Sequence, residues 1–268
     1  MKILFAAAEC APFVKIGGLA DVVGSLPKAL GKLGADIAVI LPYYESVSVK
    51  DKTKIKSGIE IEFDQKTVKV DLWQTTLPKS DIPLILVSND QYFSGEPYSG
   101  EDSRFLFFSK VVAEVAPLMN FDLVHCHDWH TGLVPYLLKG KTIFTIHNIA
   151  YQGVFKSKEV NRLIGSDFKT EEVNSIRIGI ENADLVTTVS PNYAKEILTA
   201  EFGFGLEDAL EKRKDDLFGI INGIDLDQFS PEKDSLIPRN YSIESLELKK
   251  ENKIALQEEC FSRVDLDV

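Results

Sequence analysis

Residues 2–30, KILFAAAECAPFVKIGGLADVVGSLPKAL, carry the pattern that decides the fold. Residues 3–8 are apolar without alternation, which is typical of a parallel strand buried on both faces. From Leu19 the apolar residues recur at the spacing of one helix face, although Pro27 predicts a kink or a restart in that helix. A buried strand, a loop with two glycines and a helix together predict an α/β fold.

The rest of the chain repeats this order of elements. Apolar runs at 36–42 and 82–88 predict further strands, and the alternating stretches GIEIEF and VKVDLWQTTL between them predict a small antiparallel excursion. In the second half, FDLVHCHD, KTIFTIHN and ADLVTTVS each precede a predicted helix, at 131–138, at 171–181 and after residue 190. The sequence therefore predicts a Rossmann-like, doubly wound, mostly parallel sheet.

The last part of the chain departs from this order. A strand over DLFGIINGI is followed by DQFSPEKDSLIPRNYS, which has the composition of a linker, and then by one polar helix in SLELKKENKIALQEECF. We therefore expect one large α/β domain, followed by a linker and a separate helical segment.

Composition excludes several classes of protein. The chain has 41 acidic and 30 basic side chains, a poor match for nucleic acid, whose binding needs clustered cations. Cys10, Cys126 and Cys260 are too widely spaced for a disulfide framework or a metal motif, which favours a reducing, cytoplasmic setting. No apolar run has the length of a secretory signal or a bilayer span, so we expect no membrane partner.

The first loop, residues 9–18, ends in Lys15-Ile16-Gly17-Gly18. Ligands of parallel sheets bind at the carboxyl ends of strands, glycines allow a close approach, and a helix start favours an anion. Lys15 is placed to hold a phosphate group. A tight turn beside a solvated lysine explains the same residues equally well.

The stretch HCHDWHTG, residues 125–132, suggests two kinds of site. His125, His127 and His130 raise the possibility of a metal-dependent hydrolase, but their spacing does not match the binuclear pattern and further ligands are scarce. A hydrogen-bonding site for a polar ligand is favoured, with Trp129 or Tyr98 offering a ring on which a sugar stacks. His125 also fits a plain core position.

His147 and Asn148 follow the apolar strand KTIFTI. His147 as a catalytic base has no orienting carboxylate nearby in sequence, although Asp128 could supply one through space. From these residues alone, a structural histidine at a strand end is the simpler interpretation.

Five motifs occur in a fixed order: KIGGLADVVGSLPKAL, HCHDWHTGLVPYLL, TIHNIAYQGVF, TTVSPNYAKEI and GIINGIDLDQFSP. Together they resemble the N-terminal half of the bacterial and plant glycogen and starch synthases that use ADP-glucose, glycosyltransferase family 5. The resemblance implies a GT-B fold, in which two Rossmann-like domains face each other. It implies that residues 1–230 are the N-terminal catalytic domain, and that 231–268 are the interdomain linker and the truncated start of the second domain.

The resemblance also implies an activity. Such enzymes transfer glucose from ADP-glucose to the non-reducing end of an α-1,4-glucan such as glycogen, with retention and without a metal or cofactor. The second domain supplies cations that neutralise the departing ADP, so we expect this chain to be inactive unless a separate chain supplies that domain. A non-catalytic glucan-binding domain is the alternative, and a metal-dependent hydrolase is a remote one.

Site residues carry over from the family motifs. Lys15 lies by the donor's diphosphate and glucose, and His147 lies beside the transferred glucose. With Asp128, these two form the catalytic set that the resemblance implies. The implied substrate-binding residues are Glu9, Lys15, Gly17, Gly18, Asp21, Tyr98, Asp128, His130 and Asn148, and no residue is assigned to a metal.

Overall fold

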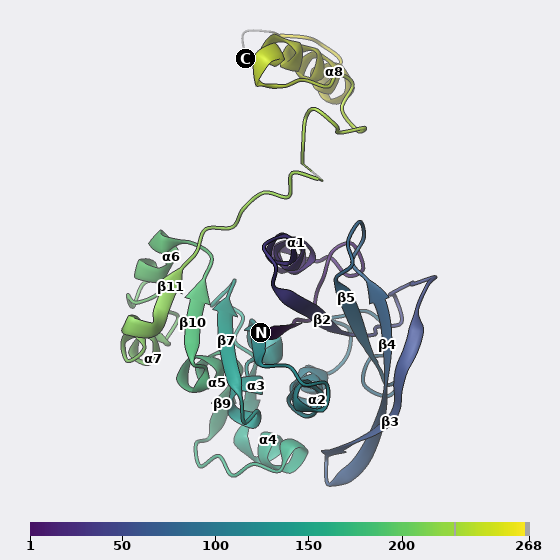
Figure 1. The fold of residues 1–268 in the computed structure, drawn as a ribbon. Coiled ribbons are helices and arrows are strands. Elements are labelled where there is room, and N and C mark those ends of the chain that lie inside the picture. The colour runs from purple at the N-terminus through teal and green to yellow at the C-terminus, as the bar shows by residue number, and fades with distance from the viewer. Residues whose placement is uncertain (228, 266–268) are drawn as a thin grey trace. The chain divides into compact units, whose positions relative to one another are not determined.

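The computed structural model describes residues 1–227 and 229–265. Contacts divide the chain into two compact units, Met1–Asn222 and Gly223–Val268. Within the described residues, the first unit contains one large sheet with the strand order β11-β10-β7-β6-β1-β2-β5-β4-β3 (Figure 1). Its strands are β1 (Lys2–Ala6), β2 (Asp36–Pro42), β3 (Thr53–Phe63), β4 (Lys66–Thr76), β5 (Pro83–Ser88), β6 (Leu123–His127), β7 (Lys141–Ile146), β10 (Leu185–Thr188) and β11 (Leu217–Gly219).

The direction of the strands confirms the predicted fold class. Neighbouring strands from β11 through to β5 are parallel, whereas β4 runs antiparallel to both β5 and β3. The turn between β3 and β4 is Asp64-Gln65, and both residues have positive φ, 54° and 57°. Two such residues in succession give a two-residue turn whose twist matches that of the flanking strands. The antiparallel excursion is thus a hairpin added to one edge of a parallel sheet.

Helices cover both faces of the sheet (Figure 1). α1 (Gly18–Lys32) packs on the face of Phe5, where Leu19 and Val23 join the core. Leu4 and Ala6 point to the opposite face, as alternation along a strand requires. Five helices contribute to the core on that face: α2 (Ser103–Leu118), α3 (Val134–Leu137), α4 (Ser157–Ile164), α5 (Ser175–Asn182) and α7 (Glu207–Glu211), among the residues that the structure describes.

Short elements complete the first unit. α6 (Pro191–Glu196) follows β10, and α7 (Glu207–Glu211) comes before β11. A small separate sheet pairs β8 (Val154–Lys156) antiparallel with β9 (Glu172–Asn174). The segment between β7 and α5 therefore holds two short strands and α4, and the helix predicted at 171–181 begins only at Ser175.

The structure specifies two expectations about helices more closely. α1 runs through Pro27 as one element and does not restart there, because Pro27 lies on the buried face of the helix and packing on the sheet outweighs one lost hydrogen bond. The helix predicted at 131–138 is a 3₁₀ turn over Trp129–Thr131 followed by α3 at Val134–Leu137. Pro135 is tolerated only in the first turn of a helix, so α3 begins just before it.

In the second unit, the described residues from 223 to 242 contain no helix or strand. A 3₁₀ helix at Ile243–Leu248 leads into α8 (Lys249–Phe261), in which no described residue is buried. A polar helix was predicted for this part of the chain, and the assignment of 231–268 as an interdomain linker and the start of a second domain stays a prediction. Across the described part of the chain, no helix combines the length and the apolar character that a bilayer span requires.

Candidate functional site

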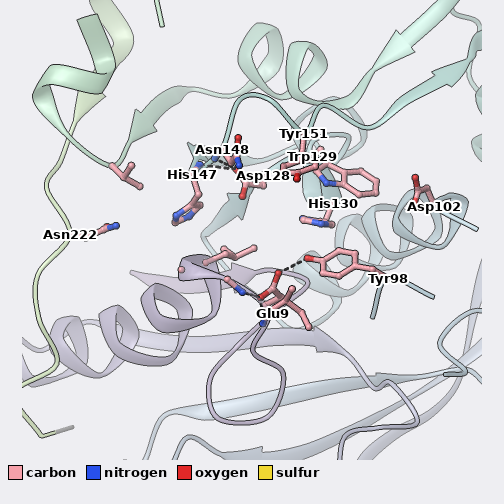
Figure 2. A pocket seen from close by; sticks show the side chains of 15 residues that line it. Glu9, Tyr98, Asp102, Asp128, Trp129, His130, His147, Asn148, Tyr151 and Asn222 are labelled. Carbon is pink, nitrogen blue, oxygen red and sulfur yellow. Dashed lines mark hydrogen bonds between the residues drawn. The ribbon is translucent and has the colours of Figure 1, made fainter. Parts of the chain in front are cut away.

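The site lies at the topological switch point of the sheet, where the order of successive strands reverses. From β1 the chain continues to β2 on one side and later returns to β6 on the other. Ligands of doubly wound sheets bind outside the carboxyl ends of the strands at such a switch. A pocket of about 670 Å³ opens there, lined by residues that follow β1, β6, β7 and β10 (Figure 2).

The pocket brings together most of the residues that the sequence predicted. It is lined by Glu9, Gly17, Gly18, Tyr98, Asp128, His130, His147 and Asn148, but not by Lys15 or Asp21. Asp102, Tyr151 and Asn222 also line it and were missed. Tyr151 is 70% exposed and lies in the motif TIHNIAYQGVF, so an aromatic residue just after a strand end was the available signal. Asp102 precedes α2, which the sequence analysis did not predict.

Glu9 ties the first loop to the wall of the pocket. Its side chain is buried, and Oε2 accepts hydrogen bonds from the N–H groups of Ile16 at 2.8 Å and Gly17 at 2.9 Å. Oε1 accepts one from the Tyr98 hydroxyl at 2.5 Å (Figure 2). Burial, and then the bond to Glu9, raises the pKa of Tyr98, so its hydroxyl remains a donor. Two N–H groups that could hold an anion are therefore already bound to a carboxylate.

Lys15 turns to Asp21 rather than into the pocket. Its Nζ lies 2.7 Å from Asp21 Oδ1, and both side chains are exposed. The two glycines have no positive φ, and an added Cβ at Gly17 or Gly18 would meet nothing within 4 Å. The backbone thus does not require glycine at either position, and what their small size provides is open space at the pocket.

Asp128 organises the loop after β7. Its Oδ1 accepts hydrogen bonds from the backbone N–H groups of His147, at 2.7 Å, and Asn148, at 3.3 Å. The sequence left open that this carboxylate orients the His147 ring, but its hydrogen bonds hold the backbone instead. Burial raises the pKa of Asp128 to about 7, although the two hydrogen bonds lower it. Asp128 has a φ of 54°, a strained conformation for a non-glycine residue that is found most often at functional sites.

The His147 ring contacts another histidine. His147 Nε2 lies 3.0 Å from His127 Nδ1, and the ring of His127 stacks on those of His125, at 4.3 Å, and Phe5, at 5.4 Å. His125 Nε2 lies 2.6 Å from Thr145 Oγ1. Burial lowers the pKa of His147 to about 4 and holds that of His127 well below its usual value. Both rings are therefore neutral at pH 7.

His130 offers unused hydrogen-bonding capacity. It is buried between the rings of Trp129, Phe105 and Tyr98, with centroid distances of 4.4, 4.7 and 5.4 Å. Within the described residues, neither of its ring nitrogens has a hydrogen-bond partner. Burial lowers its pKa to about 3. A buried polar atom without a partner is unfavourable, so a polar ligand in the pocket is its natural complement.

The histidines do not form a metal site. Nitrogens of His125 and His127 are bonded to Thr145 and His147, and His130 lies in its aromatic cage. In residues 1–227 and 229–265, no three His, Cys, Asp or Glu side chains are placed to hold one metal ion. The remote hydrolase alternative therefore has no support in the geometry.

The character of the lining indicates the class of ligand. Three carboxylates, those of Glu9, Asp102 and Asp128, face the pocket beside aromatic rings, and none of its described lining residues is Lys or Arg. Carboxylates accept hydrogen bonds from hydroxyl groups, whereas an anion needs cations or free donors. The arrangement fits a neutral, hydroxyl-rich molecule better than a phosphate.

Known proteins match this chain in sequence and in fold. The starch synthase catalytic domain family matches residues 2–212. A glycogen synthase of Pseudothermotoga lettingae is 39% identical over 302 residues, and one of Gloeobacter violaceus is 42% identical over 276; both alignments cover 100% of this chain. The catalytic domain of starch synthase IV from Arabidopsis thaliana, solved with ADP and acarbose, superposes on 96% of the chain with a TM-score of 0.86 and 32% identity.

The matches extend over only part of these relatives. The chain covers 61% of the Pseudothermotoga protein, 59% of the Gloeobacter protein and 59% of the Arabidopsis structure. A family match over most of the chain, identities near 40% and a shared fold with a GT-B enzyme all point to one group. The chain belongs to the starch synthase catalytic domain family.

Proposed function

We propose that this chain forms the glucose- and glucan-binding side of a glycogen synthase active site. The reaction is transfer of glucose from ADP-glucose to the non-reducing end of an α-1,4-glucan, with retention, in glycogen synthesis in the cytoplasm. Family membership and glycogen synthase relatives support the proposal. So does the Arabidopsis relative, which was solved with ADP and acarbose.

One observation carries the sugar-binding part of the proposal. His130, whose two buried ring nitrogens have no partner among the described residues, lines a pocket that also holds carboxylates and aromatic rings. Hydroxyl groups of a sugar satisfy such nitrogens, and a sugar ring can stack on Tyr98 or Trp129. In this proposal Tyr98, His130 and Asn148 bind glucan or glucose hydroxyls.

His147 and Asp128 take the positions closest to the reacting glucose. Asp128 fixes the backbone of His147 and Asn148 through two hydrogen bonds, so it sets the direction of the His147 carbonyl. A carbonyl held beside the anomeric carbon stabilises positive charge that develops there during transfer. Asp128 then serves catalysis by positioning, while His147 makes the contact.

The donor's diphosphate needs charge that the pocket does not supply. No Lys or Arg is found among the described lining residues, and Lys15 is paired with Asp21. That exposed pair contributes about 0–1 kcal/mol, so a diphosphate can draw Lys15 away at little cost. Departure of ADP still needs further cations, which we expect from a second Rossmann-like domain, in the same protein or in a separate chain.

Transfer of labelled glucose tests the proposal. Residues 1–268 are incubated with ADP-glucose and maltooligosaccharide, alone and with the part of the Pseudothermotoga lettingae relative that this chain does not match. We expect negligible transfer by the chain alone and measurable transfer by the mixture, if the two parts associate. Turnover by the chain alone near that of an intact synthase would show that the pocket suffices.

A binding module without transfer is the second candidate, and the absence of cations among the described lining residues favours it. Calorimetric titrations with maltooligosaccharide and with ADP-glucose separate the two. Binding of both ligands supports the synthase, and binding of maltooligosaccharide alone supports the module. Binding of neither ligand contradicts both.

A further inference from the structure

The contact between His127 and His147 contains one hydrogen bond whose direction the structure can assign. His127 Nδ1 and His147 Nε2 are 3.0 Å apart, and both rings are neutral at pH 7, so one nitrogen carries the proton and the other accepts. The choice fixes the tautomers of both rings. It also decides whether His147 presents a donor or an acceptor on its other nitrogen.

The other nitrogen of His127 distinguishes the two directions. His127 is fully buried, and in the described structure its Nε2 has no hydrogen-bond partner. If His147 donated, His127 would carry its proton on this isolated Nε2 and bury an unpaired N–H. If His127 donates, Nε2 is a bare acceptor. Among buried backbone groups, orphaned N–H donors are rarer than under-used acceptors, and the same preference applied to the ring favours the second direction.

Stacking and backbone hydrogen bonds fix the orientation of the His127 ring. It stacks on His125 and Phe5, and its backbone is held by Thr131, whose Oγ1 accepts from the His127 N–H at 2.7 Å and donates to its carbonyl at 3.0 Å. The ring therefore presents Nδ1 to His147 in a fixed position.

We propose that His127 is a positioning residue that donates from Nδ1 to His147 Nε2 and so fixes His147 as the Nδ1–H tautomer, a hydrogen-bond donor for a ligand oxygen in the pocket. His147 lines that pocket, and in the described residues Nδ1 has no hydrogen bond to the protein. The tautomer stands on the histidine geometry alone. Its use in holding glucose rests on the proposed function.

Nitrogen NMR of the full chain with ¹⁵N-labelled histidine tests this inference at pH 7. The chain has four histidines, so single substitutions assign each signal. We expect His147 to show a protonated Nδ1 and a bare Nε2 in the wild-type protein. A protonated Nε2, or an even mixture of the two forms, would overturn the proposal.

Two variants sharpen the test. His127→Phe keeps an aromatic ring in the stack but removes the donor, and should move His147 toward the Nε2–H form that free histidine prefers. His125→Phe is the matched control, because it changes the same stack but leaves the bond to His147, and should keep Nδ1–H. An unchanged His147 spectrum in His127→Phe contradicts the role of His127. The wild-type spectrum decides the case if that variant does not fold.

The NMR spectrum and the transfer assay test the two proposals independently. Absence of glucose transfer by a mixture whose two parts associate would contradict the proposed function and leave the tautomer as assigned. The wrong tautomer would remove the positioning role of His127 and leave the synthase proposal in place.

Discussion

At the scale of single residues, Gly17 and Gly18 are explained by the pocket and not by the fold. Neither has positive φ, and a methyl group at either would meet nothing within 4 Å. Gly24, inside α1, differs, because its Cβ would lie 2.5 Å from the carbonyl oxygen of Ala11. Gly17 and Gly18 therefore leave space at the pocket, whereas Gly24 allows a close backbone contact within the fold.

We predict that Gly17→Ala and Gly18→Ala keep or slightly increase stability while they weaken ligand binding. Alanine restricts the unfolded chain and gains up to about 1 kcal/mol where the conformation suits it, but its methyl group occupies space at the pocket. Urea unfolding and calorimetry with maltooligosaccharide measure the two effects. Gly24→Ala serves as the control, with lower stability from the clash with Ala11. Loss of stability in all three variants would show that the first two glycines are structural.

Asp128 gives a prediction about pH. Burial raises its pKa from 3.8 to about 7, so the folded protein binds a proton more tightly than the unfolded chain. The stability from this group is complete below pH 4 and is lost as the pH rises through 7. Asparagine does not titrate, so Asp128→Asn should not lose stability in this way. Between pH 4 and pH 8 the free energy of unfolding of the wild type should therefore fall by up to about 4 kcal/mol relative to that of the variant. Urea unfolding at several pH values measures it, and parallel curves would contradict the raised pKa.

At the scale of elements, the loop after β7 is shaped by Trp129. Gly153 has a φ of 60°, and a Cβ there would lie 2.3 Å from Trp129 Cε3. Gly165 ends α4 with a similar φ of 72°, but its Cβ would meet nothing within 4 Å. These two glycines thus share a left-handed backbone and differ in their neighbours.

Gly153→Ala should therefore cost more stability than Gly165→Ala and should also disturb the pocket. Left-handed backbone costs an alanine about 1–2 kcal/mol at either position, and only the first variant adds a clash with a side chain that lines the site. Thermal unfolding and tryptophan fluorescence compare the pair. Equal losses of stability with an unchanged emission spectrum would contradict this prediction, because they would mean that Trp129 moves aside without loss of stability.

Patterns within elements predicted most of the strands but not every helix. Apolar runs and alternation located β1, β2, β5, β6, β7 and the hairpin, because burial on one or two faces of a sheet leaves a local signature. α2 was missed because Phe105–Phe108 and much of the rest of the helix are buried, so it lacks a single polar face. α4 and the β8–β9 pair are too short to show a clear period.

At the scale of the whole molecule, the first unit holds its own core. Both large clusters of buried apolar side chains are drawn from Met1–Asn222, whereas α8 has no buried residue among those described. The segment after residue 222 therefore adds no described residue to the core of the first unit.

We predict that a protein ending at residue 222 unfolds cooperatively with a free energy within about 1 kcal/mol of that of the full chain, because the deletion removes little buried apolar area. Urea unfolding followed by circular dichroism compares the two proteins, with the slope of the transition as a check on exposed surface. A drop of several kcal/mol, or loss of cooperativity, would show that the C-terminal segment is part of the folding unit.

The sequence by itself determined the α/β class, the order of the main elements and the strand ends at which a ligand binds, because these follow from patterns within short segments. Only the tertiary structure decided the partners: Glu9 with the N–H groups of the loop, Lys15 with Asp21, Asp128 with the backbone after β7, and His127 with His147. The last two contacts join residues that the pairing of β6 with β7 brings together. The first two lie within residues 9–21, where several partners are within reach and three-dimensional packing selects one. A local sequence pattern does not contain that information.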